Sequence, residues 1–264
     1  MRTKTLLMTA AALAAGVISS QAQGTVYSQN VVGYANVTIP ANSFSLVANQ
    51  LDLGQGSNAV NNVLTTGFLG AGSGAAQSVL DIWNGATFSS FFYYNSSDVA
   101  GSGLPPGWYD ASGNPCTNNF GPSVAAFVDN PGSSSITTTL TGQVDQGTNS
   151  WTTVKTGLNF YSEPVPLAGT PLDSTNVNFP ATGPDVGPGG EQDTYQAWTG
   201  SGYGATLFYY DATTAGGFGL PAGWYDASGN YQDTNAVVWP NVGSGFLVQH
   251  VGANSNWVST FQVQ

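Results

Sequence analysis

The side chains that carry most enzyme chemistry are scarce in this chain of 264 residues. His250 is its only histidine, so it is the one candidate base for a Ser-His-Asp triad, and no G-x-S-x-G nucleophile turn accompanies it. A histidine-based metal site lacks partners for the same reason. Because His250 ends an expected strand next to a Gly-Ala-Asn turn, we expect an ordinary surface or strand-end histidine.

Paired carboxylates are the remaining route to catalysis, since a glycosidase needs only two of them. Asp110 and Asp226 stand at equivalent places in a repeated stretch, so a symmetric pair is conceivable. Each of them begins the run Asp-Ala-Ser-Gly-Asn, in which an Asp carboxylate typically accepts hydrogen bonds from its own turn. We therefore expect no enzyme activity, and a glycoside-active enzyme is the alternative that composition leaves open.

The same two runs offer oxygen ligands of the kind that Ca²⁺ prefers. Asp110–Asn114 has a single carboxylate, whereas Asp226–Asn230 has Asp233 nearby. Both lack the distant Glu of an EF-hand loop. The expectation is therefore that the protein has no cofactor, with calcium as the open alternative.

The charge balance excludes a large class of partners. The chain has 3 Lys and Arg against 14 Asp and Glu, and Arg2 and Lys4 lie in its first four residues. If that region is removed, Lys155 is the last basic residue and the net charge is 1 − 14 = −13. Nucleic acid is excluded as a partner because its phosphates require several Lys or Arg, and anionic membranes would repel the chain.

Residues 1–22 have the pattern of a secretory signal peptide. A basic start precedes an apolar stretch from Leu6 to Ile18, and small residues precede an expected cleavage site before Gln23. The pattern predicts a secreted protein, extracellular or periplasmic, with no membrane insertion after removal of the signal. Cys116 is the only cysteine, so an internal disulfide is excluded. A buried thiol, a surface thiol and an intermolecular bridge all remain open for it.

The chain repeats itself at an offset of 116 residues. The stretch Leu104–Asn114 recurs as Leu220–Asn230, and Phe-Tyr-Tyr at residues 92–94 recurs at 208–210. Further along, Phe127-Val128 aligns with Phe246-Leu247 at an offset of 119. Two copies of about 110 residues indicate a duplicated domain. The predicted division is a first β repeat with an N-terminal strand at 23–145 and a second β repeat at 146–264, joined at 145–150.

Each copy consists of short apolar and β-branched runs separated by Gly, Pro, Asn and Ser, as in antiparallel β-proteins. We therefore predict an all-β fold, a tandem duplicated antiparallel β-sandwich. A jelly-roll or Ig-like arrangement, and two domains or one continuous sandwich, remain open. Residues 58–64 could form one helical turn. The predicted strands are 34–39, 44–48, 79–83, 88–94, 107–109, 124–128 and 136–144, then 152–156, 158–162, 194–198, 206–210, 223–225, 237–238, 245–250 and 256–263.

Aromatic residues are the best candidates for ligand binding. Side chains alternate along a strand, so Phe92 and Tyr94 face one side of the sheet while Phe91 and Tyr93 face the other. An exposed aromatic face would suit sugar rings or a protein partner, whereas core packing is the plain alternative. The candidate ligand-binding residues are Phe92, Tyr94, Trp108, Phe208, Tyr210 and Trp224.

Several segments carry a resemblance to a known group. The opening 26–34 is the most specific of them, followed by 36–40, 44–49, 127–131 with 142–144, and 256–261. In these the chain resembles secreted, uncharacterised two-repeat β-rich proteins of verrucomicrobial-type bacteria. The resemblance implies export and two repeats, each with a glycine–aromatic strand. The first copy departs from it at Ala125-Ala126-Phe127-Val128, which lacks the glycine, whereas the second copy keeps Gly245-Phe246-Leu247-Val248. The resemblance transfers no catalytic or binding residue.

These observations favour a non-catalytic structural or adhesive protein of the cell surface or matrix. A strand at Val26–Tyr34 could pair with either copy or with a neighbouring molecule, which would allow self-association. The alternative is a carbohydrate-binding module that holds a polysaccharide on an exposed aromatic sheet face.

Overall fold

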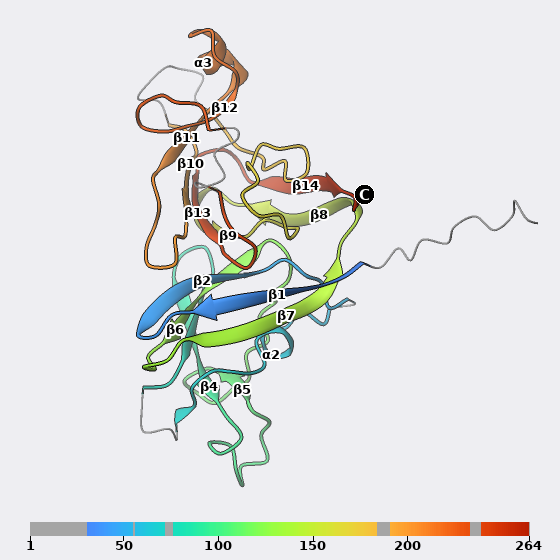
Figure 1. The fold of residues 1–264 in the computed structure, drawn as a ribbon, viewed down its shortest axis with the longest axis vertical. Helices are drawn as coiled ribbons and strands as arrows, with labels where there is room; N and C mark the ends of the chain where they lie inside the picture. Colours follow the sequence, from blue (N-terminus) through green and yellow to red (C-terminus); the bar gives the residue numbers. More distant parts are fainter. Residues whose placement is uncertain (1–30, 55, 72–75, 184–190, 233–238, 264) are drawn as a thin grey trace, which may run out of the picture. The chain divides into compact units, whose positions relative to one another are not determined.

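The computed structural model of the chain describes residues 31–54, 56–71, 76–183, 191–232 and 239–263. The signal, residues 26–30 and the predicted strand at 237–238 lie outside the described residues. Antiparallel strands make up nearly all regular structure (Figure 1). The predicted all-β, sandwich-like fold class is therefore confirmed.

One ten-stranded antiparallel sheet runs through both halves of the chain. The first half supplies β2 (Ser43–Asn49), β3 (Val79–Trp83), β4 (Phe88–Tyr94), β5 (Gly107–Tyr109) and β6 (Val124–Asn130). The second supplies β9 (Gly157–Tyr161), β10 (Thr194–Ala197), β11 (Leu207–Tyr210), β12 (Gly223–Tyr225) and β13 (Phe246–His250). The strands pair in the order β2-β6-β3-β4-β5 in the first half and β9-β13-β10-β11-β12 in the second. The same pairing order thus occurs twice in a continuous sheet.

Each half has a separate two-stranded ribbon. Strands β1 (Val31–Ile39) and β7 (Ile136–Val144) form the first, and β8 (Gly147–Val154) and β14 (Ser255–Phe261) form the second. One prediction about these segments was wrong, because residues 147–150 belong to β8 and are no linker. Residues 31–34 pair with β7 of the first repeat, which is one of the partners expected for the strand at 26–34.

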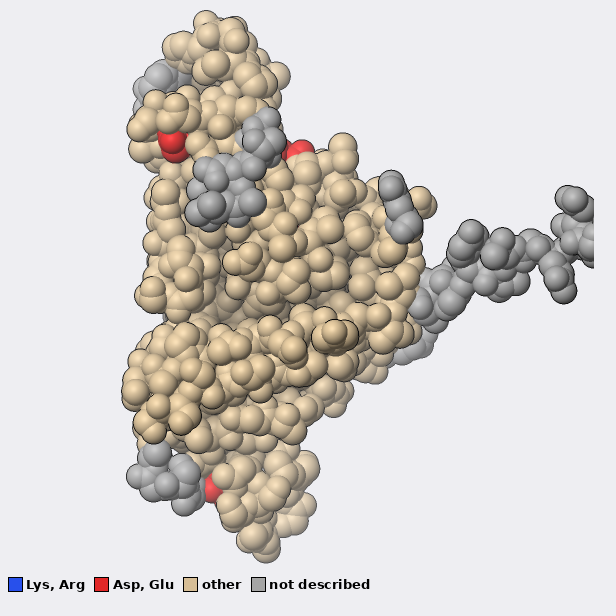
Figure 2. Space-filling model, in the orientation of Figure 1, with Lys and Arg blue, Asp and Glu red and all other residues tan. Residues whose placement is uncertain are grey.

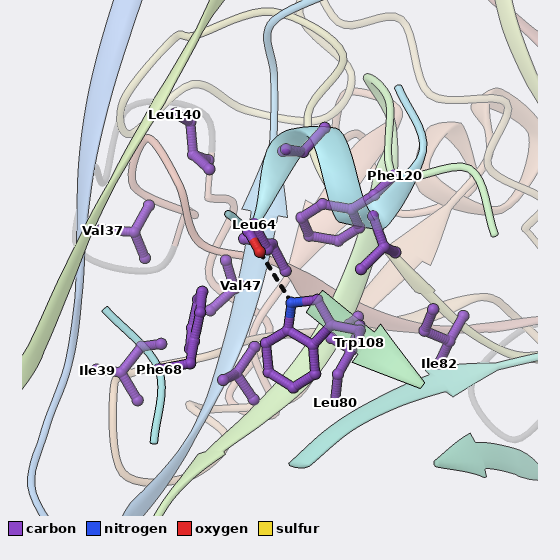
Figure 3. Packing of buried hydrophobic residues seen from close by; sticks show 14 of the residues in the cluster. Val37, Ile39, Val47, Leu64, Phe68, Leu80, Ile82, Trp108, Phe120 and Leu140 are labelled. Atoms are coloured by element: carbon purple, nitrogen blue, oxygen red, sulfur yellow. Dashed lines mark hydrogen bonds between the residues drawn. The ribbon is translucent and has the colours of Figure 1, made fainter. Parts of the chain in front are cut away.

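The cores lie between each ribbon and one face of the sheet, which we call the inner face. Val37 and Leu140 of the first ribbon share a buried cluster with Leu80 and Ile82 of the sheet (Figure 3). The second cluster joins Trp257 and Val154 of the second ribbon to sheet residues such as Val248. Each half is therefore a two-layer sandwich of its own, because alternate residues of each strand are apolar and face inward.

Helices contribute little. The predicted turn at 58–64 forms as α2 (Val60–Val63), which carries the buried Val60 and Val63. A second short helix, α3 (Ala212–Gly216), was not predicted because it has no apolar period. Asp211 starts it by accepting a hydrogen bond from the backbone N–H of Thr214.

The halves meet along two short stretches of backbone, β9 with β6 and the edge of β2 with residues 243–245. Ser162 N donates to Ser123 O across β9 and β6 at 3.2 Å, and Ala48 N donates to Gly243 O at 3.0 Å on the open edge of β2. Around this seam the inner-facing residues are Ala126 and Val128 in β6, and Phe246 and Val248 in β13. The two strands therefore correspond at an offset of 120. The alignment of Phe127 with Phe246 at 119 was wrong, since one residue of slip exchanges the faces of a strand.

Candidate functional site

The repeated Gly-Trp-Tyr stretch is structural. Trp108 and Trp224 point into the two cores and are fully buried, so the prediction that they line a binding surface was wrong. The Trp108 indole Nε1 donates to Leu64 O at 2.9 Å (Figure 3). The next residue in each copy, Tyr109 and Tyr225, bonds through its hydroxyl to a proline carbonyl four residues upstream.

The turn after each Gly-Trp-Tyr stretch behaves as predicted. Asp110 Oδ1 accepts hydrogen bonds from the backbone N–H of Ser112 at 2.9 Å and of Asn114 at 2.8 Å, and Asp226 repeats this pattern. The Asn114 side chain is the main cause that lowers the pKa of Asp110, and Asn230 does the same for Asp226. Both carboxylates accept hydrogen bonds from their own turns, and calcium at these runs stays the open alternative to the expected absence of a cofactor.

The other four predicted residues lie on the opposite, outer face of the sheet. Phe92 and Tyr94 of β4, like Phe208 and Tyr210 of β11, are half-buried. The Tyr94 ring packs on Tyr109 with a centroid distance of 5.7 Å, and the Tyr210 ring packs on Tyr225 at 5.2 Å. Phe208 also lines an open hollow of about 640 Å³. The structure does not bring the four residues together in one site.

A different set of aromatic residues does converge, near the seam on the outer face. It forms a shallow groove of about 370 Å³, here called the aromatic groove, lined by Phe44, Asp81, Phe88, Phe127, Phe160, Trp198 and Tyr203. β2, β3, β4 and β6 supply the residues from the first half. β9 supplies Phe160, and the residues after β10 supply Trp198 and Tyr203. The groove therefore requires both halves of the chain.

The rings of the groove hold one another in place edge to face. Phe127 contacts Phe88 at 5.8 Å, Phe160 at 5.3 Å and Trp198 at 5.4 Å between ring centroids. Trp83 flanks the groove, packs on Phe88 at 4.9 Å, and donates its indole N–H to the Leu158 carbonyl at 2.8 Å. Such tilted contacts stabilise aromatic pairs, so the walls are preorganised.

Three of the groove rings remain open to solvent. Phe44 is 50% exposed, Phe88 42% and Tyr203 41%. Beneath them, Leu46, Ala48 and Ala125 form a small buried cluster that supports Phe127, Phe160 and Trp198. The groove thus offers exposed ring surface on a rigid base.

Carboxylates alternate with the rings across the strands. Asp129 of β6 pairs in register with Phe44, and Asp81 of β3 pairs with Phe127 on one side and Ser90 on the other. The Ser90 hydroxyl donates to Asp81 Oδ1 at 2.5 Å. Burial and then the nearby charge of Asp81 raise the pKa of Asp129. The groove therefore combines apolar ring surface with hydrogen-bond acceptors.

Three buried ionisable groups, His250, Asp193 and Glu163, lie away from the groove in the described part of the second half. His250, predicted as an ordinary strand-end residue, is buried and bonds through Nδ1 to Asp193 Oδ2 at 2.7 Å. Glu163 is fully buried next to Tyr195, and burial raises its pKa well above 4.5. Neither oxygen of Glu163 has a hydrogen-bond partner in the part of the chain that the structure describes.

Cys116 is buried, which selects one of the three alternatives for its thiol. Burial raises the pKa of the Cys116 thiol, so the reactive thiolate is disfavoured. A surface thiol and an intermolecular bridge do not match this position.

Sequence reasoning did not find the aromatic groove. Phe44 and Tyr203 are single aromatic residues and Phe160 precedes Tyr161, all in unrelated stretches, whereas the repeated motifs pointed to Trp108 and Trp224. One feature of the sequence could have indicated the groove. Side chains alternate along β6, so Phe127 lies on the face opposite the buried Val128.

Comparisons with known proteins add no function. Scans against models of protein families, against curated proteins and against solved structures each found no match for this chain. Within the described residues, no helix combines the length and apolar character needed to cross a membrane. In that same part of the chain, no three His, Cys, Asp or Glu side chains gather as metal ligands do.

Proposed function

We propose that the protein binds an uncharged polysaccharide in the aromatic groove, without chemically altering it, and serves as an adhesive protein outside the cytoplasm. The observation that carries this proposal is the row of solvent-open rings beside Asp81 and Asp129. Ring faces pack against the C–H faces of sugars, and carboxylates accept hydrogen bonds from sugar hydroxyls. Mostly apolar sites with a few placed polar groups are typical of small-ligand recognition.

The charge of the groove narrows the ligand class. Asp81 and Asp129 line or flank it, and the whole chain has a formal net charge of −11. An anionic polysaccharide would be repelled, as would a nucleic acid. A neutral polysaccharide is not repelled by these charges, and it can still pack on the rings and donate hydrogen bonds to the carboxylates.

The proposal joins the two functions expected from the sequence. Adhesion was the leading expectation, and carbohydrate binding through an aromatic sheet face was the alternative. The aromatic groove supports that alternative with residues other than the six that were predicted. Export, the two-repeat origin and the likeness to secreted verrucomicrobial-type proteins remain part of the proposal.

Binding to a panel of soluble neutral polysaccharides tests the proposal, with the fluorescence of Trp83 and Trp198 as the readout. Phe44→Ala and Tyr203→Ala should each weaken binding about tenfold, which corresponds to ~1.4 kcal/mol for a buried aromatic anchor. The matched control is Phe218→Ala, because Phe218 is 61% exposed and lies outside the groove.

The control variant should bind as the wild type does. If no neutral polysaccharide perturbs the fluorescence or is retained by the immobilised protein, the proposed function is wrong. Equal losses in the groove variants and in Phe218→Ala would also refute it.

A further inference from the structure

We propose that the outer edge of β1 pairs with the same edge of a second copy of the protein, so that two copies form an antiparallel, two-fold dimer. The proposal concerns the ribbon of the first half, on the inner side of the sheet. The aromatic groove lies on the outer face, so the two proposals stand on separate surfaces.

Strand β1 is a long, regular strand with one partner. Its nine residues pair with β7 in unbroken register, from Val31 opposite Val144 to Ile39 opposite Ile136. In the part of the chain that the structure describes, β1 has no other strand partner. The backbone groups on its second edge therefore remain available for a ladder.

Comparable edges in the fold are covered. The open side of β7 is bridged by Asp52, which exchanges two backbone hydrogen bonds with Gln143 at 2.9 and 2.7 Å. Single bridges also cover β5 at Pro115 and β12 at Tyr231. The strands of the other ribbon, β8 and β14, form a ladder with an irregularity between residues 256 and 258. Among these described edges, β1 is the one that has both an unbroken register with its partner strand and no β-bridge along its open side.

The side chains of β1 lack the features that keep edges apart. The sequence Val-Val-Gly-Tyr-Ala-Asn-Val-Thr-Ile has no charge and no proline, the two usual means of blocking edge-to-edge pairing. Val32 is 75% exposed and Tyr34 is 77% exposed, so apolar surface lies beside the open edge. Pairing would cover part of it.

Charge favours a second copy at this place. The chain is strongly acidic, so two copies repel each other over most of their surface. β1 and β7 contain no charged residue, and no charged side chain covers them in the face that Figure 2 shows. A two-fold interface presents the same strand from both copies, and an antiparallel β1 pair satisfies that symmetry.

Sedimentation of the purified chain from residue 23 onward, over a wide range of concentration, tests the proposal. The wild type should shift from monomer to twice the monomer mass. The double variant Val32→Lys/Tyr34→Lys should stay monomeric, because like charges oppose each other across the edge. The matched control is Thr141→Lys, since Thr141 is exposed opposite Tyr34 but lies on β7, away from the edge.

Thr141→Lys should dimerise as the wild type does. A wild type that remains monomeric overturns the proposal, as does a double variant that still dimerises, or a Thr141→Lys variant that dissociates equally.

Hydrogen exchange on the wild type is a second test, which needs no substitution and therefore cannot be confused by a variant that fails to fold. Amides of β1 should exchange more slowly at high concentration, and unchanged exchange would overturn the proposal. Polysaccharide binding is measured separately, so its failure leaves this result intact.

Discussion

Gly245 lies directly against Ala125 where the two halves of the chain meet. A Cβ placed on Gly245 would stand 2.5 Å from the Ala125 Cβ and 2.8 Å from Leu46 Cγ. The backbone N–H of Gly245 also donates to Leu46 O at 3.0 Å, so the strand cannot move away without losing this bond. The absence of a side chain at this position lets the halves approach each other.

Gly245→Ala should therefore destabilise the fold by about 1–3 kcal/mol, the usual cost of overpacking a close contact. Chemical denaturation measures the loss. Gly202→Ala is the matched control, because a Cβ on Gly202 meets nothing within 4 Å. A loss of stability in the control as large as that in Gly245→Ala would contradict the explanation.

Asn61 joins α2 to the Gly-Trp-Tyr stretch of the first half. Its Oδ1 accepts from Trp108 N at 2.7 Å, and its Nδ2 donates to the carbonyls of Trp108 and Cys116, both at 3.2 Å. Asn61→Ala should cost about 3 kcal/mol, because it leaves the Trp108 N–H and the Cys116 carbonyl without this partner, while Trp108 O keeps its bond from Cys116 N. Asn62→Ala is the control, since Asn62 makes one exposed bond to Ser57 O. Thermal unfolding should separate the two variants clearly, and similar midpoints would refute this role.

Glu163 should make the protein less stable as the pH rises. Its pKa is raised by burial, so the folded chain keeps a proton that the unfolded chain releases above about pH 4.5. The stabilising contribution is complete below that pH and is lost as the pH rises towards the folded-state pKa. Denaturation midpoints measured across this range should fall less steeply in Glu163→Gln, which cannot ionise.

The exposed Glu191 provides the comparison for this measurement. Glu191→Gln should reproduce the wild-type slope of stability against pH. The buried Glu163 carboxyl differs from other fully buried polar side chains. Asn49 at the end of β2, for example, has a partner for its amide, because Nδ2 donates to Phe120 O at 2.8 Å. An unchanged slope in Glu163→Gln would show that this carboxyl is not the source of the dependence.

The charge of Asp81 should influence the titration of Asp129 beside the aromatic groove. Burial and the charge of Asp81 raise the pKa of Asp129, so Asp81→Asn should lower it. Carboxyl carbon chemical shifts in an NMR titration measure this directly. Asp98→Asn serves as a control that removes an acidic residue from outside the groove. If both variants leave the Asp129 titration unchanged, the proposed coupling is wrong.

Alternation and turn residues were enough to predict most of the fold. The strands at 79–83, 88–94, 107–109, 136–144 and 223–225 have the expected bounds, because each consists mostly of apolar, aromatic or β-branched residues and is followed by an Asn or Asp. β8 was predicted too short, since Thr148, Asn149 and Ser150 look like a polar linker. They pair with β14 because the ribbon faces solvent on one side.

The candidate site could not be predicted in the same way. Its residues come from strands of both halves, and their meeting depends on which edges pair at the seam. That pairing rests on small contacts such as Val124 opposite Tyr161, which leave no pattern in the sequence. The most visible repeat, Gly-Trp-Tyr, reflects packing instead. At Gly107 a Cβ would lie 2.7 Å from Asn61 Oδ1, and Trp108 fills the core.

The seam also has a consequence for synthesis. β2 ends at Asn49, and the segment that covers its edge, Gly243–Gly245, is translated almost 200 residues later. The N-terminus leaves the ribosome first, so the edge of β2 stays unpaired until nearly the whole chain has been made. Unpaired strand edges are prone to wrong association. A nascent chain stalled before residue 243 should therefore be a better chaperone client than the finished protein.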